Sequence, residues 1–529
     1  MKPILAAVGQ VTLAACLFAA TPVIATAAPS LPSTNVAWLP AAADADITRA
    51  FALAKAQGKP VLLYWGATWC PPCNQLKATF FNRQEFATLS RSFIAVHIDG
   101  DRPGAQKLGQ RFKVSGYPTV VLMTADGAEI TRLPGEVDAP QALAVLQQGI
   151  AGGRPVKAVL ADALAGKTQA AADWRQLAFY SWDTDEQQLM PKADVPGTLV
   201  ALAVASPAAD VETTTRLWLK ALAASDEGKG VKPDAALRER VLRVLADPAQ
   251  SRLHMDIVTS SAAEIVRALD GDGIPAAGAA PTPLIAAFEA ALTRLEADAT
   301  LSRGDRLGAL YARVDLARLG YPKDTVQLRL AEPLVKDVRE HVARVDREIT
   351  DGYERQAVIT GAGSLLARTG LWAESDALLK ANLAKSHSPY YLMSQLGSNA
   401  RKLGNKAEAL RWYEQAFTKS EGPATRLQWG SGYLGALTEL APQDASRIEK
   451  LAAKLFAEAA KDSGAFEGRS VHSMQRVSKR LMTWNADGKQ AGAIARLRTQ
   501  LDAMCPKVDA GDERKACDAL LRPAAKKAA

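Results

Sequence analysis

Two cysteines separated by two prolines are the residues best suited to chemistry in this sequence. In Trp69-Cys70-Pro71-Pro72-Cys73, the cysteines stand one helical turn apart, so their sulfurs can come within bonding reach. The apolar residues 60–66 predict a buried strand before them, and residues 74–81 predict a helix after them. At the start of a helix, free backbone N–H groups and the helix dipole stabilise a thiolate. The pattern therefore predicts thiol–disulfide exchange, with an exposed Cys70 as the nucleophile and Cys73 as the resolving cysteine.

The two prolines indicate the redox character of this pair. Pro71 and Pro72 both suit the first turn of a helix, where a backbone N–H would have no partner within the helix. Each proline also removes an amide donor that could face the Cys70 sulfur. A less stabilised thiolate belongs to a more reducing couple. We therefore expect a reductase or isomerase and not a strong oxidant.

Short strands and helices must position this pair. Apolar runs at 93–98 and 119–123 predict two more strands. Asp126-Gly127 predicts a hairpin turn that leads to a return strand at 129–133, and residues 141–150 predict a closing helix. This order predicts an α/β fold in which a small mixed sheet is flanked by helices.

Residues 35–150 resemble the thioredoxin family, and in particular its periplasmic Dsb-type domains. The likeness rests on Trp69-Cys70-Pro71-Pro72-Cys73 and on Tyr117-Pro118-Thr119, some 45 residues further on. It implies that Pro118 is a cis-proline and that Tyr117 and Trp69 belong to the site. It also implies protein disulfides or dithiols as substrates, an upstream redox partner and no organic cofactor. A trans proline in an ordinary loop is the alternative at Pro118.

One position departs from the family pattern. Six residues before the first cysteine, thioredoxins usually carry a buried acid that deprotonates the second cysteine, and here that residue is Tyr64. Two other interpretations of the cysteine pair remain. A zinc site needs two further ligands and none is near in the sequence, because His97 is isolated; we therefore expect no metal. The pair could also be a fixed structural disulfide.

The remainder of the chain is rich in Ala, Leu and Arg at helical spacing, which predicts helical regions at 156–270 and 281–525. The segment between them is rich in Gly, Ala and Pro and is interpreted as a flexible joint. Residues 356–423 resemble two tetratricopeptide units, since Gly363 and Gly397, like Gly370 and Gly404, are 34 positions apart. Stacked units of this kind form a concave surface for a protein ligand, or a scaffold with no specific ligand.

Two further cysteines lie near the end of the sequence. Cys505 and Cys517 are twelve positions apart, with Pro506 and an acidic turn between two helical stretches. We expect a structural disulfide that fastens this terminal hairpin. A second redox pair, supplied with electrons by Cys70, is the alternative.

The first 27 residues have the pattern of a secretory signal peptide. Lys2 precedes an apolar stretch at 4–20, and Ala25-Thr26-Ala27 forms a small-x-small cleavage site. Cleavage would place the protein in the periplasm or outside the cell, where disulfides persist. A lipoprotein acylated at Cys16 and a membrane tether are the alternatives.

Composition narrows the class of protein. The 529 residues include 64 Lys and Arg against 56 Asp and Glu, and the net charge of +8 is spread without a long basic block, so we expect no nucleic-acid partner. Aromatic residues make up 6%, which favours helices over sheets in the remainder of the chain. The resulting hypothesis is an exported thiol–disulfide oxidoreductase, most simply a reductase or isomerase. The alternative is a non-enzymatic periplasmic helical-repeat scaffold with an accessory thioredoxin-like domain.

Overall fold

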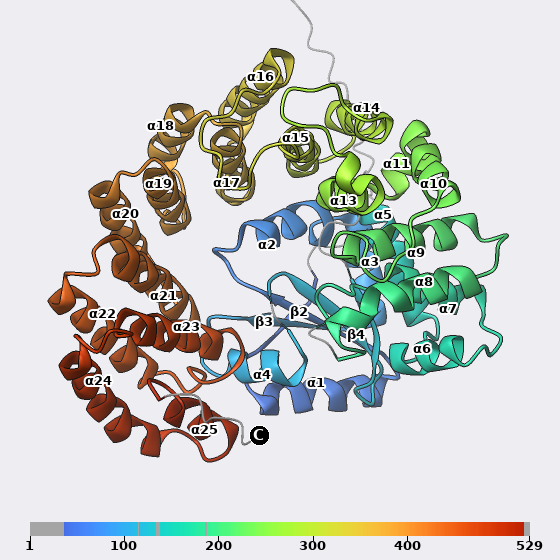
Figure 1. Ribbon diagram of the computed structural model, residues 1–529. Helices are drawn as coiled ribbons and strands as arrows, with labels where there is room; N and C mark the ends of the chain where they lie inside the picture. Colours follow the sequence, from blue (N-terminus) through green and yellow to red (C-terminus); the bar gives the residue numbers. More distant parts are fainter. Residues whose placement is uncertain (1–35, 115, 134–137, 186–187, 523–529) are drawn as a thin grey trace, which may run out of the picture.

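The apolar runs of the first 150 residues form one mixed sheet (Figure 1). The computed structural model describes residues 36–522 except 115, 134–137 and 186–187, so the expected signal peptide and Cys16 lie outside the described residues. The strand order is β1-β3-β2-β4-β5, in which β1, β3 and β2 are parallel and β4 and β5 are antiparallel additions. The strands are β1 (Leu39–Ala41), β2 (Val61–Gly66), β3 (Ile94–Asp99), β4 (Thr119–Met123) and β5 (Glu129–Leu133).

Five helices accompany the sheet: α1 (Asp44–Gln57), α2 (Pro71–Leu76), α3 (Gln84–Leu89), α4 (Ala105–Arg111) and α5 (Ala139–Ile150). The α/β prediction is confirmed, and so is the hairpin turn, where Gly127 has a φ of +89°. The helix expected at 74–81 begins earlier, because prolines at 71 and 72 fit its first turn, and it continues as a π-helical turn over Lys77–Phe81. β1 and α1 were not expected from the sequence.

The remainder of the described chain is helical. Its helices are α6 (Val156–Leu164), α7 (Ala171–Phe179), α8 (Val195–Ala205), α9 (Val211–Ala224), α10 (Ala235–Ala246), α11 (Pro248–Leu253), α12 (Met255–Ser260), α13 (Ala262–Asp270), α14 (Pro283–Ala297), α15 (Arg303–Ala317), α16 (Glu332–Glu348), α17 (Gly352–Arg368), α18 (Trp372–Asn382), α19 (Tyr390–Lys402), α20 (Lys406–Lys419), α21 (Pro423–Leu440), α22 (Ala445–Ala459), α23 (Gly468–Trp484), α24 (Ala491–Met504) and α25 (Asp512–Asp518). No helix among the described residues has the length and apolar character needed to span a bilayer.

The glycines spaced by 34 residues have a structural reason. Gly370 and Gly404 follow α17 and α19 with φ angles of +88° and +80°, the left-handed conformation that ends a helix. Gly363 and Gly397 lie inside these helices, where an added Cβ would stand 2.6 Å from Leu379 and 3.1 Å from Tyr413, respectively. Gly363 and Gly397 therefore allow close packing between the two helices of a pair, α17 with α18 and α19 with α20, respectively.

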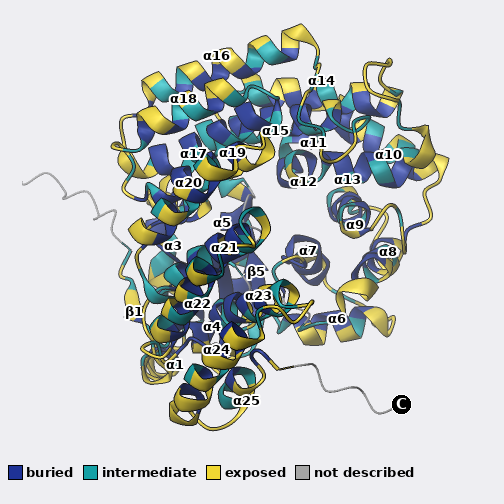
Figure 2. Cartoon of the chain, turned by 60° about the vertical axis from the view of Figure 1, so that its left-hand side comes forward, coloured by how far each residue is buried: buried dark blue, intermediate teal, exposed yellow. Residues whose placement is uncertain are grey.

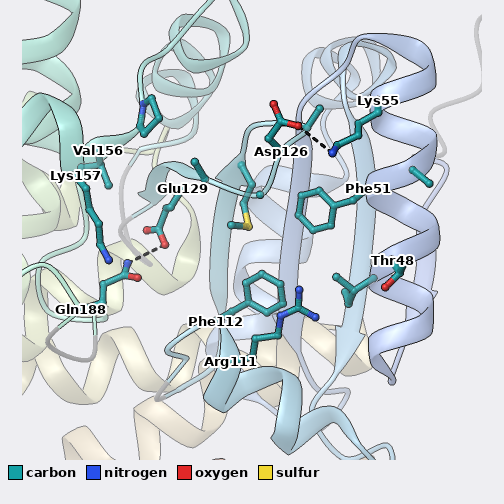
Figure 3. A pocket seen from close by; sticks show the side chains of 17 residues that line it. Thr48, Phe51, Lys55, Arg111, Phe112, Asp126, Glu129, Val156, Lys157 and Gln188 are labelled. Atoms are coloured by element: carbon teal, nitrogen blue, oxygen red, sulfur yellow. Dashed lines mark hydrogen bonds and ion pairs between the residues drawn. The ribbon is translucent and has the colours of Figure 1, made fainter.

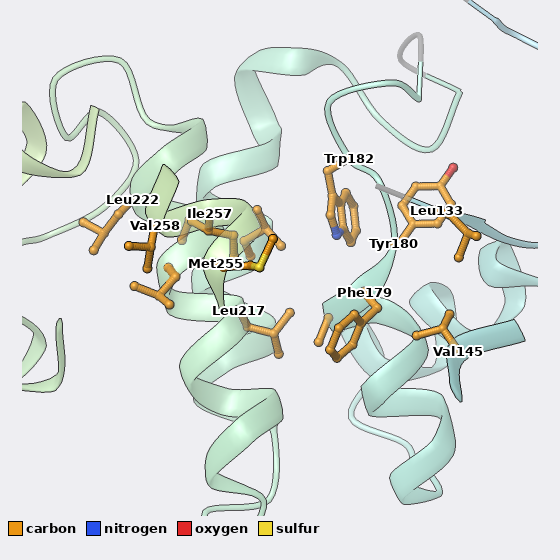
Figure 4. Close-up of a cluster of buried hydrophobic side chains, with 14 of the residues drawn as sticks. Leu133, Val145, Phe179, Tyr180, Trp182, Leu217, Leu222, Met255, Ile257 and Val258 are labelled. Carbon is orange, nitrogen blue, oxygen red and sulfur yellow. The ribbon is translucent and has the colours of Figure 1, made fainter. Parts of the chain in front are cut away.

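The hydrophobic core of the sheet continues into the first helices that follow it. Leu133 and Val145 lie in one cluster with Phe179 of α7, Leu217 of α9 and Val258 of α12 (Figure 4). The same cluster extends to α14 and α15, beyond the segment expected to be a flexible joint. In the structure α13 packs on both α14 and α15, so the glycine-rich segment connects helices of one continuous core and does not separate two bodies.

The helices pass around the sheet and return to it (Figure 1). α6 packs on β5 at one end of this arc, and α23 packs on α4 at the other. Between these ends, α2 packs on α17 from the inner side of the arc. The outer side of α16 carries exposed residues (Figure 2). The concave face that the repeats were expected to offer to a protein ligand thus holds the chain's own α2.

Candidate active site

The cysteine pair lies at the N-terminus of α2. Cys70 is the N-cap residue, and Pro71 and Pro72 occupy the first two helical positions. Cys70 and Cys73 form a disulfide, and the Cys70 sulfur accepts a hydrogen bond from the Cys73 backbone N–H at 3.2 Å. This amide is the one that remains after the two prolines, and together with the helix dipole it stabilises negative charge on the Cys70 sulfur.

The residues just before β4 complete the pair's surroundings. The Tyr117–Pro118 peptide bond is cis, and the Tyr117 carbonyl oxygen lies 3.6 Å from the Cys70 sulfur. The Tyr117 ring centre is 6.3 Å from that of Trp69. The five residues singled out in the sequence, Trp69, Cys70, Cys73, Tyr117 and Pro118, are therefore brought together. Thr119, the first residue of β4, fastens this segment, because its hydroxyl donates to the Gly116 carbonyl at 2.8 Å.

The expectation of an exposed Cys70 was wrong. Cys70 and Cys73 are each 2% exposed. They share an apolar cluster with residues of α18 to α20, among them Leu379, Met393 and Trp412. A sulfur at a helix N-terminus is solvent-accessible only when nothing packs over it, and here the helical region supplies that cover.

Aromatic residues of α19 and α21 form part of the cover. Tyr391 stacks on Trp69, with ring centres 5.7 Å apart, and Trp429 meets Tyr391 edge-on at 5.0 Å. The Gln356 side-chain amide of α17 donates to the Trp69 carbonyl at 3.5 Å. The cysteine pair is thus enclosed by side chains that come from far along the sequence.

Asp101 joins the sheet to the helical region, and sequence reasoning missed this role. Its carboxylate accepts hydrogen bonds from the Trp69 indole and from the Thr425 backbone N–H (2.9 Å) and hydroxyl (2.6 Å). Burial raises the pKa of the Asp101 carboxyl, while the hydrogen bonds from Thr425 and Trp69 act in the opposite direction.

Arg469 of α23 was also missed. Its guanidinium lies 5.0 Å from the ring centre of Trp69 and 4.9 Å from that of Tyr117. Its backbone N–H donates to Gln106 of α4 at 2.9 Å, and Gln106 in turn donates to the Tyr117 hydroxyl at 3.0 Å. Nη1 of Arg469 is buried and meets no hydrogen-bond partner among the described residues. A cation from the end of the chain therefore stands over both aromatic residues that flank Cys70.

Tyr64 does not replace the usual buried acid as a base. It is buried in the core, and its ring stacks on His97 at 5.0 Å. Burial, and to a lesser extent the charge of Asp99, raises the pKa of Tyr64. The phenol therefore stays protonated at neutral pH and can donate a hydrogen bond but cannot take up a proton.

Two hollows lie near the sheet. One, of about 830 Å³, is lined by Pro71, Pro72 and Pro118 on one side and by Tyr391 and Trp429 on the other, so it adjoins the cysteine pair. The other, of about 690 Å³, lies between α1, the β4–β5 turn and the start of α6 (Figure 3). None of the five sequence-predicted site residues lines this second hollow.

The distant cysteine pair is also a disulfide. Cys505 and Cys517 are bonded to each other and are 2% and 0% exposed. They belong to an apolar cluster with Leu501 and Leu520. Among the residues that the structure describes, no three His, Cys, Asp or Glu side chains are grouped as metal ligands.

Comparisons with known proteins match the first domain. A family model described as a thioredoxin-like domain matches residues 47–150. The thiol:disulfide interchange protein DsbD 2 of Pseudomonas aeruginosa is 31% identical over 111 residues, which are 20% of this chain and 19% of that protein. DsbD of Yersinia pestis is 34% identical over 99 residues, or 18% of this chain and 17% of that protein. The match thus spans about a fifth of the length of these curated relatives.

A solved thioredoxin from Thermus thermophilus is 30% identical and aligns over 22% of this chain and 88% of its own, with a TM-score of 0.20. The similarity of this chain to known proteins and the position of its cysteine pair fall on the same segment. Residues 47–150 form a thioredoxin-like domain similar to DsbD, and a large helical region follows it.

Proposed function

We propose that this protein is an exported thiol–disulfide oxidoreductase that reduces or isomerises disulfides of periplasmic proteins. The observation that carries the proposal is the Cys70–Cys73 disulfide at the N-terminus of α2, with the Tyr117 carbonyl 3.6 Å from the Cys70 sulfur. The relatives that match this domain are named thiol:disulfide interchange proteins. Trp69 and Tyr117 would shape the rim beside the sulfur, and Pro118 would position an extended substrate next to it.

The reaction needs only sulfur chemistry. The Cys70 thiolate attacks one sulfur of the substrate disulfide, which forms a mixed disulfide and releases the other substrate sulfur as a thiolate that takes up a proton. The Cys73 thiolate, whose proton passes to solvent, then attacks the Cys70 sulfur. This step forms the Cys70–Cys73 disulfide and releases the second substrate thiolate, so two electrons have passed to the substrate. A protein dithiol upstream restores the reduced pair.

The remaining parts of the proposal concern the chain outside this pair. Residues 1–27 would direct export, residues 35–150 would carry the chemistry, and the helical regions at 156–270 and 281–525, with repeats at 356–423, would position clients or partners. Cys505–Cys517 would be structural. No organic cofactor is required, because Cys70 and Cys73 carry the electrons.

Turnover and redox equilibrium test the proposal together. The protein should reduce a disulfide-bonded peptide with dithiothreitol as the electron donor, and Cys70→Ala should abolish this activity. Equilibration with glutathione should give a reducing potential, and a value near about −120 mV, as in the strongest oxidants of this chemistry, would refute the reductase assignment.

The burial of the pair favours one second candidate. With Cys70 and Cys73 each 2% exposed, a periplasmic scaffold in which this disulfide only holds α2 in place is consistent with the packing. If the native protein and Cys70→Ala both showed only background activity, the scaffold proposal would be supported and the oxidoreductase proposal would be ruled out.

A further inference from the structure

A closed redox pair beside an open cavity raises the question of how a substrate reaches the sulfur. The cover over Cys70 leaves this residue only 2% exposed, so a folded protein on the outer surface would not contact its sulfur. The adjoining cavity of about 830 Å³ is of the size that takes a drug-sized ligand or a short peptide segment. A small folded domain is about 30 Å across and would not enter it.

The helical region leaves this space open by placing small residues along it. Gly308 of α15 and Ala357 of α17 line the cavity, and a Cβ added at Gly308 would meet no atom within 4 Å. Opposite them lie Pro71 and Pro118, the neighbours of the redox pair in the two segments that build the site. The cavity therefore extends from the residues beside the redox pair into the space between the sheet and α15, α17 and α19.

One face of α19 forms a wall with unused polar groups. Tyr391, Ser394, Gln395 and Ser398 stand at helical spacing and all line the cavity. Within the described part of the chain, the side chains of Ser394 and Gln395 make no hydrogen bond with another residue. A hydroxyl and an amide at these positions can serve the backbone N–H and C=O groups of an extended chain.

Three charged residues line the cavity, of which two are ion-paired and one is hydrogen-bonded. Arg83 pairs with Glu85 at 3.1 Å, and Asp138 pairs with Arg252 at 3.1 Å. Asp305 accepts a hydrogen bond from the Ser302 hydroxyl at 2.7 Å. An acidic side chain would lose hydration here and meet only Arg83, which is already paired, and a basic one would meet only Asp138, which is already paired, and Asp305, which already accepts from Ser302.

We propose that this cavity is the substrate-binding site and that its α19 wall restricts the substrate to an extended, uncharged, cysteine-bearing peptide segment. The inference rests on the proposed function and adds to it the class of substrate. The disulfide of such a segment would reach Cys70 past Pro118, and the Ser394 and Gln395 side chains would hold its backbone. A disulfide on the surface of a folded protein would be excluded.

Three substrates and two glycine variants test this inference with the full-length protein. The substrates are an unstructured uncharged peptide with a disulfide, a folded protein with a surface disulfide, and the small neutral hydroxyethyl disulfide. Gly308→Leu narrows the cavity without a clash at its Cβ, and Gly492→Leu on exposed α24, where an added Cβ meets only Arg496 at 3.6 Å, is the matched control.

We expect the native protein to reduce the peptide at least about tenfold faster than the folded protein, and Gly308→Leu to lower kcat/KM for the peptide by about tenfold. Gly492→Leu should reduce the peptide as fast as the native protein does. Neither substitution should change the rate of hydroxyethyl disulfide reduction or the reduction potential of the Cys70–Cys73 pair.

Equal rates for peptide and folded protein, or an unchanged peptide rate in Gly308→Leu, would overturn the cavity assignment and leave the oxidoreductase intact. An equal loss with hydroxyethyl disulfide would also overturn it, because the substitution would then act on the dithiol. A native protein that reduces none of the three, although its Cys70–Cys73 pair is reversibly reduced, would overturn both proposals.

Discussion

Cys70–Cys73 and Cys505–Cys517 are both disulfides, and each of the four residues is 2% exposed or less. They differ in their place on the helices. Cys70 is the N-cap of α2, whereas Cys505 follows the last residue of α24 and Cys517 is the next-to-last residue of α25. The positive end of a helix dipole stabilises a thiolate, and the negative end disfavours it.

The hollows beside the two pairs also differ. The cavity next to Cys70 has three charged lining residues, which are already ion-paired or hydrogen-bonded. The hollow of about 450 Å³ at Cys505 and Cys517 is lined by the charged residues Arg498, Asp502, Asp518 and Arg522. Burial alone therefore does not distinguish the two disulfides, whereas helix polarity and the chemistry of the adjoining space do.

The largest difference between the two pairs is expected when one sulfur of each pair is freed by substitution of its partner. Cys73→Ala leaves Cys70 without its resolving partner, so a mixed disulfide with a disulfide-bonded peptide should accumulate nearly completely. Cys517→Ala leaves Cys505 at a helix C-terminus, and no adduct should form in the same time. Mass spectrometry of the intact protein measures both. Comparable adducts on the two variants would make the distal pair a second redox site.

The free energy of unfolding should depend more on the Cys505–Cys517 disulfide than on the Cys70–Cys73 disulfide. In the chain-entropy account, removing a disulfide that closes a 12-residue separation costs about 3 kcal/mol, so Cys505→Ala combined with Cys517→Ala should lower the free energy of unfolding by about that amount. Cys70→Ala combined with Cys73→Ala, which opens a separation of only 3 residues, should cost less. Urea denaturation of the two double variants gives the values. A larger loss at the first pair would contradict its assignment as the redox pair.

The charge of Arg469 should sharpen the contrast further. Because its guanidinium lies about 5 Å from the rings of Trp69 and Tyr117, it favours negative charge on the nearby Cys70 sulfur. Arg469→Met should make the Cys70–Cys73 couple more reducing and slow alkylation of reduced Cys70 at pH 7 by roughly threefold. Arg469→Lys keeps the charge and should restore most of the rate, whereas equal losses in both variants would indicate a packing role only.

The smallest expected effect is a pH dependence of stability from Glu467, which lies where the C-terminal helices contact α4. Burial and the neighbouring Glu513 raise the pKa of Glu467 to about 8, while Lys107 acts in the opposite direction and the charge of Asp44 adds to the increase. The folded chain then holds a proton that the unfolded chain releases above pH 4.5, so this contribution to stability is greatest at low pH and is lost as the pH rises through 8.

Glu467→Gln mimics the protonated form. The native protein should unfold roughly 2 °C below this variant at pH 9 and at nearly the same temperature at pH 5. Calorimetry at both pH values measures the difference. If the two proteins differed in unfolding temperature by the same amount at both pH values, Glu467 would not be the titrating group.

Much of the fold could be predicted because its signals are local. β4 begins and ends where its apolar run does, and β5 is the return strand that the turn at Asp126-Gly127 predicts. α1 escaped prediction because two of its three buried residues are alanines, Ala50 and Ala54, which give a weak periodic signal. β1 escaped because it is only 3 residues long. The position of the cysteine pair at a helix start followed from the prolines beside it.

The covering of that pair could not be predicted in the same way. Tyr391, Trp429 and Arg469 carry no motif, and each would suit an ordinary helix face. Tyr391 and Arg469 contact Trp69, and Trp429 contacts Tyr391. These contacts depend on how some twenty helices stack in succession, since the direction of the arc accumulates from the packing of each helix on the next.

The amino-acid sequence by itself determined the chemistry of this protein: a two-residue spacing places two sulfurs on one helical turn, and glycines spaced by 34 residues end paired helices. These results depend on neighbours along the chain, whose geometry the backbone fixes. Only the tertiary structure decided which molecules can reach the sulfurs, because the contacts that join the sheet to its helical cover are distant in sequence. Asp101, for example, accepts a hydrogen bond from Thr425, which lies 324 positions away. Contacts at that separation arise from the packing of the whole arc, which no local pattern encodes.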